Sequence, residues 1–342
     1  MCAHVASGAN WAEPSRSLSH FAEWPGSSFE TLALDHGTGT RSTGGPGPRV
    51  DDARCGAIGG AWQCGAMASP FTLMTVHAHP DDESSSTGGV LAMYAHEGVR
   101  TVVVTCTNGE FGDAPGGIKP GEAGHDETSV AAIRLAELDK ACDILGVDVL
   151  EKLGYHDSGM AEWEYRHRRD AFCNVSMEES SARLAGLMER YQPQVVITYD
   201  EFGGYNHPDH VQANRVTMAA IERTGIPAKL YFTARRWSDF ERLRTRLAAS
   251  GVDMGPRPPI DAERRRRLEA VAARITTTVD TIPVASRKRD ALRAHASQLA
   301  QSWFAKMPES MFDEVFGVES FIREHNRTAA PVPETDLFAG LR

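Results

Sequence analysis

Two short stretches of the chain gather side chains that bind metals and transfer protons. The first is VHAHPDDE, residues 76–83, and the second is GGYNHPDH, residues 203–210. Each combines histidine, proline and aspartate, and each follows an apolar run that is typical of a buried strand. We therefore expect the two stretches, although far apart in the sequence, to form the halves of one metal site.

The residue types and spacing suit a catalytic divalent ion. His79 and Asp82 are three residues apart on a turn that enters a helix, a spacing that lets both side chains converge on one point. His210 offers a third ligand from the second stretch. Two imidazoles and one carboxylate with an open position suit Zn²⁺, or less selectively Fe²⁺. Such an ion polarises a carbonyl oxygen and makes hydroxide available near neutral pH.

The remaining ionisable residues offer the proton transfers that a hydrolysis needs. Asp81 is free to take a proton from water as a general base, and His207 is placed to stabilise an oxyanion or to protonate a leaving amine. Asp209 is suited to holding a histidine ring in one tautomer. A single HPDD motif would more often be a capped turn, since aspartate is a good N-cap residue. Two such clusters, each after a buried strand, favour the metal site over capping.

The composition excludes several other functions. The chain has 342 residues, is 41% hydrophobic and carries a net charge of −10, which argues against nucleic acid as its main partner. The basic run Arg264–Arg267 fits a solvated helical face. Six cysteines without a CxxC pair indicate a reducing, cytoplasmic setting. No run of 18 apolar residues and no secretory signal is present, so we expect no membrane span.

Strands and helices alternate around the two stretches. This order predicts a Rossmann-like α/β fold with a mostly parallel sheet and helices on both faces. Sites in such sheets form beyond the carboxyl ends of the strands. The expected strands cover 71–78, 99–107, 147–155, 193–200 and 228–234, and the expected helices 85–98, 127–146, 180–191, 209–225, 237–250, 262–274 and 287–299.

Composition also suggests how the chain is divided. Residues 1–68 are rich in Gly, Pro, Ser and Thr and lack an apolar period, which predicts a disordered extension before a functional start near Met67. Residues 69–228 should form the catalytic core. Residues 229–330 should form a smaller α+β part that completes the substrate pocket, and residues 331–342 a tail.

The AHPDDE stretch together with the distant HPDH resembles the LmbE-like, or PIG-L, superfamily of zinc-dependent N-deacetylases. The resemblance runs from about Phe71 to Glu324. It implies a Rossmann-like fold and hydrolysis of the acetamide of N-acetylglucosamine-type sugars. It also implies roles for six residues of the two stretches. His79, Asp82 and His210 would be the zinc ligands, and Asp81 the general base. His207 would be the cationic or acid partner, and Asp209 its supporting carboxylate.

Within this superfamily the chain is most similar to the mycothiol branch. That likeness places Tyr205 where the branch has a mobile tyrosine, Arg134 where it has a substrate-binding arginine, and Asp157 where a carboxylate contacts sugar hydroxyls. Simpler explanations stay open for each. Arg134 could pair with an acidic neighbour, Glu137 or Asp139, on its helix, Asp157 could belong to an ordinary turn, and Tyr205 could simply pack.

These observations predict a hydrolase that removes an acetyl group from a small aminosugar substrate. One alternative is an amidase that cleaves mycothiol S-conjugates, although Ser86 and Thr87 stand where the conjugate amidase carries a lysine. An alternative of another class is a metal-binding relative without catalysis. The intact Asp81 argues against it, because such a relative would need no general base.

Overall fold

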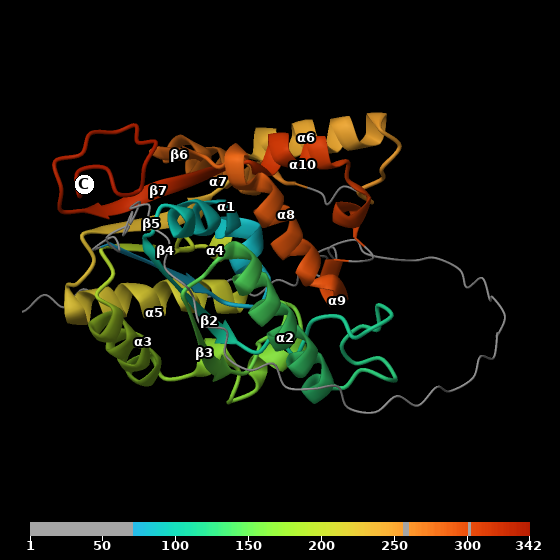
Figure 1. The fold of residues 1–342 in the computed structure, drawn as a ribbon. Helices are drawn as coiled ribbons and strands as arrows, with labels where there is room; N and C mark the ends of the chain where they lie inside the picture. Colours follow the sequence, from blue (N-terminus) through green and yellow to red (C-terminus); the bar gives the residue numbers. More distant parts are fainter. Residues whose placement is uncertain (1–70, 256–259, 300–301) are drawn as a thin grey trace, which may run out of the picture.

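A single twisted sheet forms the centre of the protein (Figure 1). The computed structural model describes residues 71–255, 260–299 and 302–342, so the expected extension at 1–68 lies outside the described residues. The strand order is β3-β2-β1-β4-β5-β7-β6, with β1 to β5 parallel and β7 antiparallel to both of its neighbours. The strands are β1 (Thr72–His77), β2 (Arg100–Thr107), β3 (Val149–Tyr155), β4 (Val195–Thr198), β5 (Lys229–Ala234), β6 (Thr277–Asp280) and β7 (Val318–Asn326).

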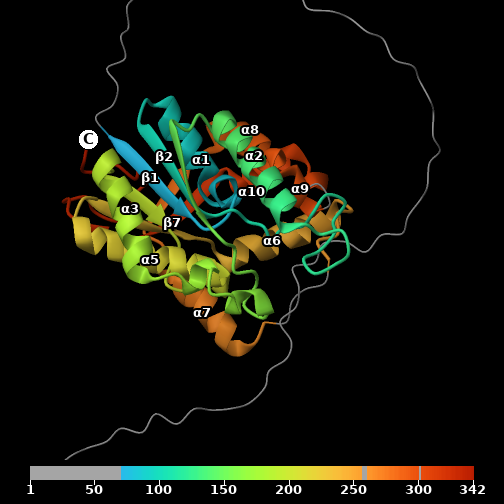
Figure 2. The same cartoon turned by 90° about the horizontal axis from the view of Figure 1, so that it is seen from below.

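Helices cover both faces of this sheet, which confirms the predicted fold class (Figures 1 and 2). Helices α3 (Met177–Tyr191) and α5 (Pro208–Thr224) pack on one face, and α1 (Asp82–His96), α2 (Glu127–Leu145) and α8 (Ala285–Ala294) on the other. The β2 sequence shows why its apolar run is continuous: Val102 and Val104 enter one core and Val103 the other. Among the described helices, none has both the length and the apolar character needed to cross a bilayer.

The two ionisable stretches follow β1 and β4, the neighbouring strands at which the strand order of the sheet changes direction. Strand β1 lies between β2 and β4. The chain continues from β1 to β2 on one side, and from β4 to β5 on the other side. Helix α1 follows β1 onto one face, whereas α5 follows the β4 end onto the other. In open α/β sheets a crevice forms beyond the carboxyl ends of the strands at such a point, here β1 and β4, and it is the usual place for a site.

The C-terminal part continues the same sheet. Strand β5 pairs with β4 across the expected boundary at 228/229, and β7 and β6 extend the sheet beyond it. Leu337 and Phe338, which we expected in a tail, are fully buried, and the Phe338 ring contacts Tyr94 of α1. The remaining longer helices are α6 (Trp237–Ala249), α7 (Ala262–Ala273) and α10 (Glu309–Phe316), and the single helix expected over 287–299 is divided into α8 and α9 (Ala296–Leu299) at His295.

A buried carboxylate fixes helix α1, whose first turn belongs to the crevice. Glu319 of β7 accepts hydrogen bonds from the backbone N–H groups of Gly89 (2.8 Å) and Val90 (2.9 Å), and from Lys288 Nζ (2.6 Å). Position 89 has room only for glycine, because a Cβ there would lie 2.3 Å from Thr281 Oγ1 and 2.9 Å from Glu319 Oε1. The close approach of β7 to α1 therefore depends on this residue.

We predict that Gly89→Ala lowers the free energy of unfolding by about 1–3 kcal/mol, the usual cost of overpacking. Gly186→Ala is the matched control, because Gly186 is an exposed helical glycine whose Cβ would meet nothing within 4 Å. That control should gain about 0.5–1 kcal/mol from helix propensity. Urea unfolding of both variants makes the comparison, and equal stability of the two would contradict the packing argument.

Candidate metal centre and active site

Three predicted ligands converge in the crevice with the spacing of a metal site. The distance from His79 Nδ1 to Asp82 Oδ2 is 3.4 Å, from His210 Nε2 to His79 Nδ1 3.3 Å, and from His210 Nε2 to Asp82 Oδ2 3.4 Å. All three residues are buried. A tetrahedral ion with ligand bonds of about 2.0–2.1 Å holds its donors about 3.3–3.4 Å apart. The donor set and its spacing therefore fit a divalent metal.

The other nitrogen of His79 faces carboxylates. Its Nε2 lies 3.2 Å from Asp209 Oδ2 and 3.6 Å from Asp157 Oδ1. A carboxylate that accepts the Nε2 proton leaves the Nδ1 lone pair free for a metal, as is usual for ligating histidines. Burial alone would lower the pKa of His79, but the surrounding carboxylates raise it well above its ordinary value. Binding of a metal at Nδ1 would therefore release a proton.

Further donor atoms gather around the same ring. Atoms of His79, His207 and His210 lie within 4.8 Å of one another, and so do atoms of His79, Asp157, His207 and Asp209. The second group contains the Nε2 partners of His79, so it orients this ligand and does not form a separate site. The donor atoms of His79, Asp82 and His210 are 3.3–3.4 Å apart, which fits a common ion, and their role as metal ligands stays a prediction.

Two residues that the sequence analysis missed hold these groups in place. Tyr199 donates its hydroxyl proton to Asp82 Oδ2 (2.8 Å), accepts from the Ala78 N–H (2.9 Å), and stacks on His210 with ring centroids 4.1 Å apart. Ser158 donates its backbone N–H (2.8 Å) and its hydroxyl to Asp209. Tyr199 follows the last residue of β4, and that position at a strand end was the signal in the sequence.

Asp81 pairs through its carboxylate with Arg134, next to the candidate ligand Asp82. It is the N-cap of α1 with a left-handed backbone, φ 115° and ψ −24°, and its Oδ2 accepts from Arg134 Nη2 at 3.0 Å. Burial raises the pKa of Asp81, and the Arg134 guanidinium opposes that rise. The side chain is still 28% exposed. The two adjacent aspartates therefore have different partners: Asp82 faces His79 and His210, and the partly exposed Asp81 faces Arg134.

Arg134 is buried in the wall of the site. Besides Asp81, its guanidinium donates to the carbonyl oxygens of Gly109 (2.7 Å) and Pro80 (2.6 Å). The alternative of a surface pair on its own helix does not occur, since Glu137 accepts from Ser297 and Asp139 from Lys152. Arg134 thus lies beside the candidate base, and its contact with a substrate stays a prediction.

His207 and Asp209 differ from the arrangement that we expected. The Asp209 carboxylate contacts His79, and only the Asp209 backbone N–H meets His207, at Nδ1 (3.2 Å). The reason is local: His207 is the N-cap of α5, so its ring accepts the N–H two residues ahead. Burial and the neighbouring imidazoles lower the pKa of His207 well below its ordinary value. The neutral ring then carries its proton on Nε2.

The last two predicted residues lie beside the same histidines. Tyr205 is 47% exposed, and its ring contacts His210 and His207 edge-on with centroids 4.9 and 5.8 Å apart. It stands in the kinked segment α4 (Gly203–Asn206) after Gly204, whose φ is 71°. Asp157 is buried and accepts from the Gly159 N–H (2.8 Å), a bond typical of a turn, while it also faces His79. Their contact with a substrate stays a prediction.

Comparison with known proteins reveals clear sequence relatives. Residues 74–221 match the PIG-L family, described as GlcNAc-PI de-N-acetylase. The 1D-myo-inositol 2-acetamido-2-deoxy-alpha-D-glucopyranoside deacetylase of Acidothermus cellulolyticus is 40% identical over 281 residues, 79% of this chain and 95% of the relative. The deacetylase of the same name from Streptomyces avermitilis is 36% identical over 293 residues, 79% of this chain and 97% of the relative.

A solved structure supports the fold. The 4-carboxy-2-hydroxymuconate hydratase of Pseudomonas putida KT2440 has a TM-score of 0.52 at 17% identity, over 76% of this chain and 99% of the hydratase. At this identity the likeness extends to the fold alone. Because that protein is named as a hydratase, the fold by itself does not define the reaction.

We predict that His210→Ala abolishes stoichiometric metal binding, because only His79 and Asp82 of the three proposed donors remain. His125→Ala is the control, since the His125 ring contacts the Gly112 carbonyl in a loop outside the cluster. Both variants would be loaded with Zn²⁺ as a probe, freed of excess metal by gel filtration and assayed for metal content. Full zinc occupancy in His210→Ala would contradict the assignment.

Proposed function

We propose that this chain, which belongs to the PIG-L family, is a metal-dependent hydrolase that removes the N-acetyl group from a glucosamine residue linked to inositol. The family match at 74–221 contains every residue predicted for the site. The two relatives named above, both deacetylases of an acetylated glucosaminyl inositol, align over at least 95% of their own lengths. The observation that carries the proposal is the cluster of metal donors with Asp81 beside it.

The ligand set supports zinc as the metal. Two imidazole nitrogens and one carboxylate oxygen leave a coordination position open, the usual arrangement of a catalytic zinc site. His79, Asp82 and His210 would hold the ion. When bound, it would polarise the amide carbonyl and increase the acidity of a water molecule.

Asp81 is the proposed general base. Its partly exposed carboxylate takes a proton from the attacking water, and burial makes it a stronger base by raising its pKa. The Arg134 guanidinium opposes that rise and favours the ionised carboxylate that a base requires. Both effects together favour a carboxylate that accepts a proton during the attack and is able to return it.

His207 and Tyr205 are the proposed donors to the oxyanion. Because His207 Nδ1 accepts the Asp209 N–H, the neutral imidazole offers its Nε2–H as a hydrogen-bond donor. The lowered pKa of His207 makes this neutral form dominant, which favours stabilisation of the oxyanion over proton donation. The Tyr205 hydroxyl is a second donor whose exposed segment allows it to approach a bound substrate.

The departing amine needs a proton, and Asp81 is the group best placed to give it. After accepting the proton of water, Asp81 is a carboxylic acid whose Oδ2 is still positioned by Arg134. Transfer of this proton to the amide nitrogen lets the C–N bond break, which yields the free amine and acetate. One residue then acts first as base and then as acid.

We predict that Asp81→Ala retains its metal but loses turnover by about 10²–10⁴-fold, the usual contribution of a general base. Asp139→Ala removes a carboxylate that pairs with Lys152 on the surface, and it should keep full activity. Metal content and kcat would be measured on the same samples. Loss of metal in Asp81→Ala would mean that Asp81 and Asp82 exchange the roles proposed here.

We predict that the zinc-loaded protein releases free amine from N-acetylglucosaminyl-inositol faster than from N-acetylglucosamine or from a mycothiol S-conjugate. The inositol portion supplies binding energy that the simple sugar lacks. A fluorogenic amine assay measures all three substrates, with Asp81→Ala as the blank. Preference for the conjugate would identify the alternative amidase, and no release from any substrate would refute the proposed function.

A further inference from the structure

A buried histidine, His295, lies at the break between α8 and α9 and contacts the first turn of α1. His295 is the C-cap residue of α8, and its Nε2 lies 2.7 Å from Glu83 Oε1. Both residues are fully buried. Among the described residues, the His295 Nδ1 has no hydrogen-bond partner, so the polar contact of this ring is directed to Glu83.

Glu83 passes this contact on to Asp81. Its Oε1 accepts from His295 and from the Ser84 hydroxyl (2.5 Å), and its Oε2 accepts the backbone N–H of Asp81 (2.9 Å). Each oxygen of the carboxylate therefore has a separate task. Oε1 bonds to His295, in the C-terminal part of the chain, and Oε2 bonds to the backbone of Asp81, the proposed base.

The backbone of Asp81 requires such support. A non-glycine residue at φ 115° has a strained backbone, which persists only where its surroundings hold it. The unusual φ turns the Asp81 carboxylate toward Arg134 while the next residue, Asp82, faces the histidines. Arg134 holds the side chain of Asp81, and Glu83 holds its N–H. Relaxation of either contact would move the carboxylate.

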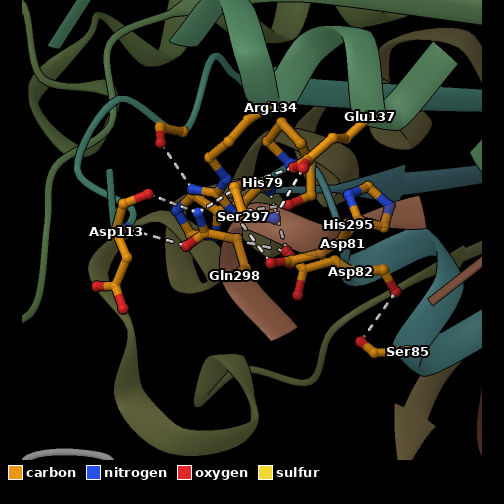
Figure 3. A network of polar contacts seen from close by, with 12 residues as sticks. His79, Asp81, Asp82, Ser85, Asp113, Arg134, Glu137, His295, Ser297 and Gln298 are labelled. Atoms are coloured by element: carbon orange, nitrogen blue, oxygen red, sulfur yellow. Dashed lines mark hydrogen bonds and ion pairs between the residues drawn. The ribbon is translucent and has the colours of Figure 1, made fainter. Parts of the chain in front are cut away.

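Ser297 and Gln298, which follow His295, contact helix α2 and the loop after β2. The Ser297 backbone N–H and hydroxyl each donate to Glu137 at 2.7 Å, on the helix that carries Arg134. Gln298 donates to the Asp113 carbonyl (3.0 Å) and accepts the Asp113 N–H (3.1 Å), in the loop that follows β2 (Figure 3). The segment 295–298 thus reaches the α1 turn, α2 and this loop, and only His295 leads to the backbone of Asp81.

We propose that His295 is a positioning residue for the reaction, which acts through Glu83 to hold Asp81 in its strained conformation. This inference rests on the proposed function for its kinetic consequence, but its structural content does not depend on turnover. If the His295–Glu83 pair served stability alone, its loss would lower the melting temperature and leave kcat unchanged. A positioning role lowers kcat and leaves KM and metal content close to those of the unaltered protein.

The kinetic test compares His295→Leu with His295→Gln. Leucine fills the space without a donor, and we expect kcat to fall about 100-fold, as is typical when a reacting group is misplaced by about 1 Å. Glutamine offers an amide N–H at a similar reach and should recover most of that loss. Ser297→Ala is the matched control, because it removes a hydroxyl contact of the same segment that leads to Glu137. If His295→Leu does not fold, His295→Asn, shorter by one methylene than glutamine, replaces it.

A second measurement does not require activity. Hydrogen–deuterium exchange of a peptide that spans Asp81 reports whether its N–H is held by Glu83. We expect faster exchange in His295→Leu, and exchange like that of the unaltered protein in His295→Gln and Ser297→Ala. Unchanged exchange and kcat in His295→Leu would overturn the positioning role. An unaltered protein that releases no amine would refute the proposed function alone, while the exchange data still decide the inference.

Discussion

The convergence of His79, Asp82 and His210 on one point is the constraint that the rest of the site satisfies. Three buried donors, mutually 3.3–3.4 Å apart, would be costly without partners to bond. Two hydrogen bonds reduce that cost: Asp209 accepts the Nε2 proton of His79, and Tyr199 donates its hydroxyl proton to Asp82. The sheet brings these groups together because β1 and β4 are adjacent at the point where its connections diverge.

Two neighbouring aspartates face different partners, and the backbone of the first, Asp81, is strained. At φ 115° the Asp81 carboxylate meets Arg134, and the Asp82 carboxylate meets the two imidazoles. An ordinary helical start would not separate the two carboxylates in this way. Glu83 holds the strained backbone by accepting the Asp81 N–H, and Glu83 is itself in buried contact with His295, 212 residues further along the chain. The catalytic geometry therefore depends on packing between segments that are distant in sequence.

The fold and the chemistry are separable in this protein. A protein named as a hydratase shares the architecture at 17% identity, so the fold alone does not define the reaction. The sequence relatives named as deacetylases, together with the donor set and its adjacent base, point to amide hydrolysis. The exposed Tyr205 and the loops around the crevice are where the substrate would be distinguished.

The sequence by itself determined the strand–helix alternation and the parallel core, and it predicted the candidate ligands, because apolar periodicity and clustered histidines and aspartates are local patterns. It did not determine the partners of these groups. The supporting roles of Tyr199 and Ser158, the contact of Asp209 with His79, and the extension of the sheet by β7 all join residues that lie far apart in the chain. Such contacts exist only after the layers have packed, so the tertiary structure alone decided them.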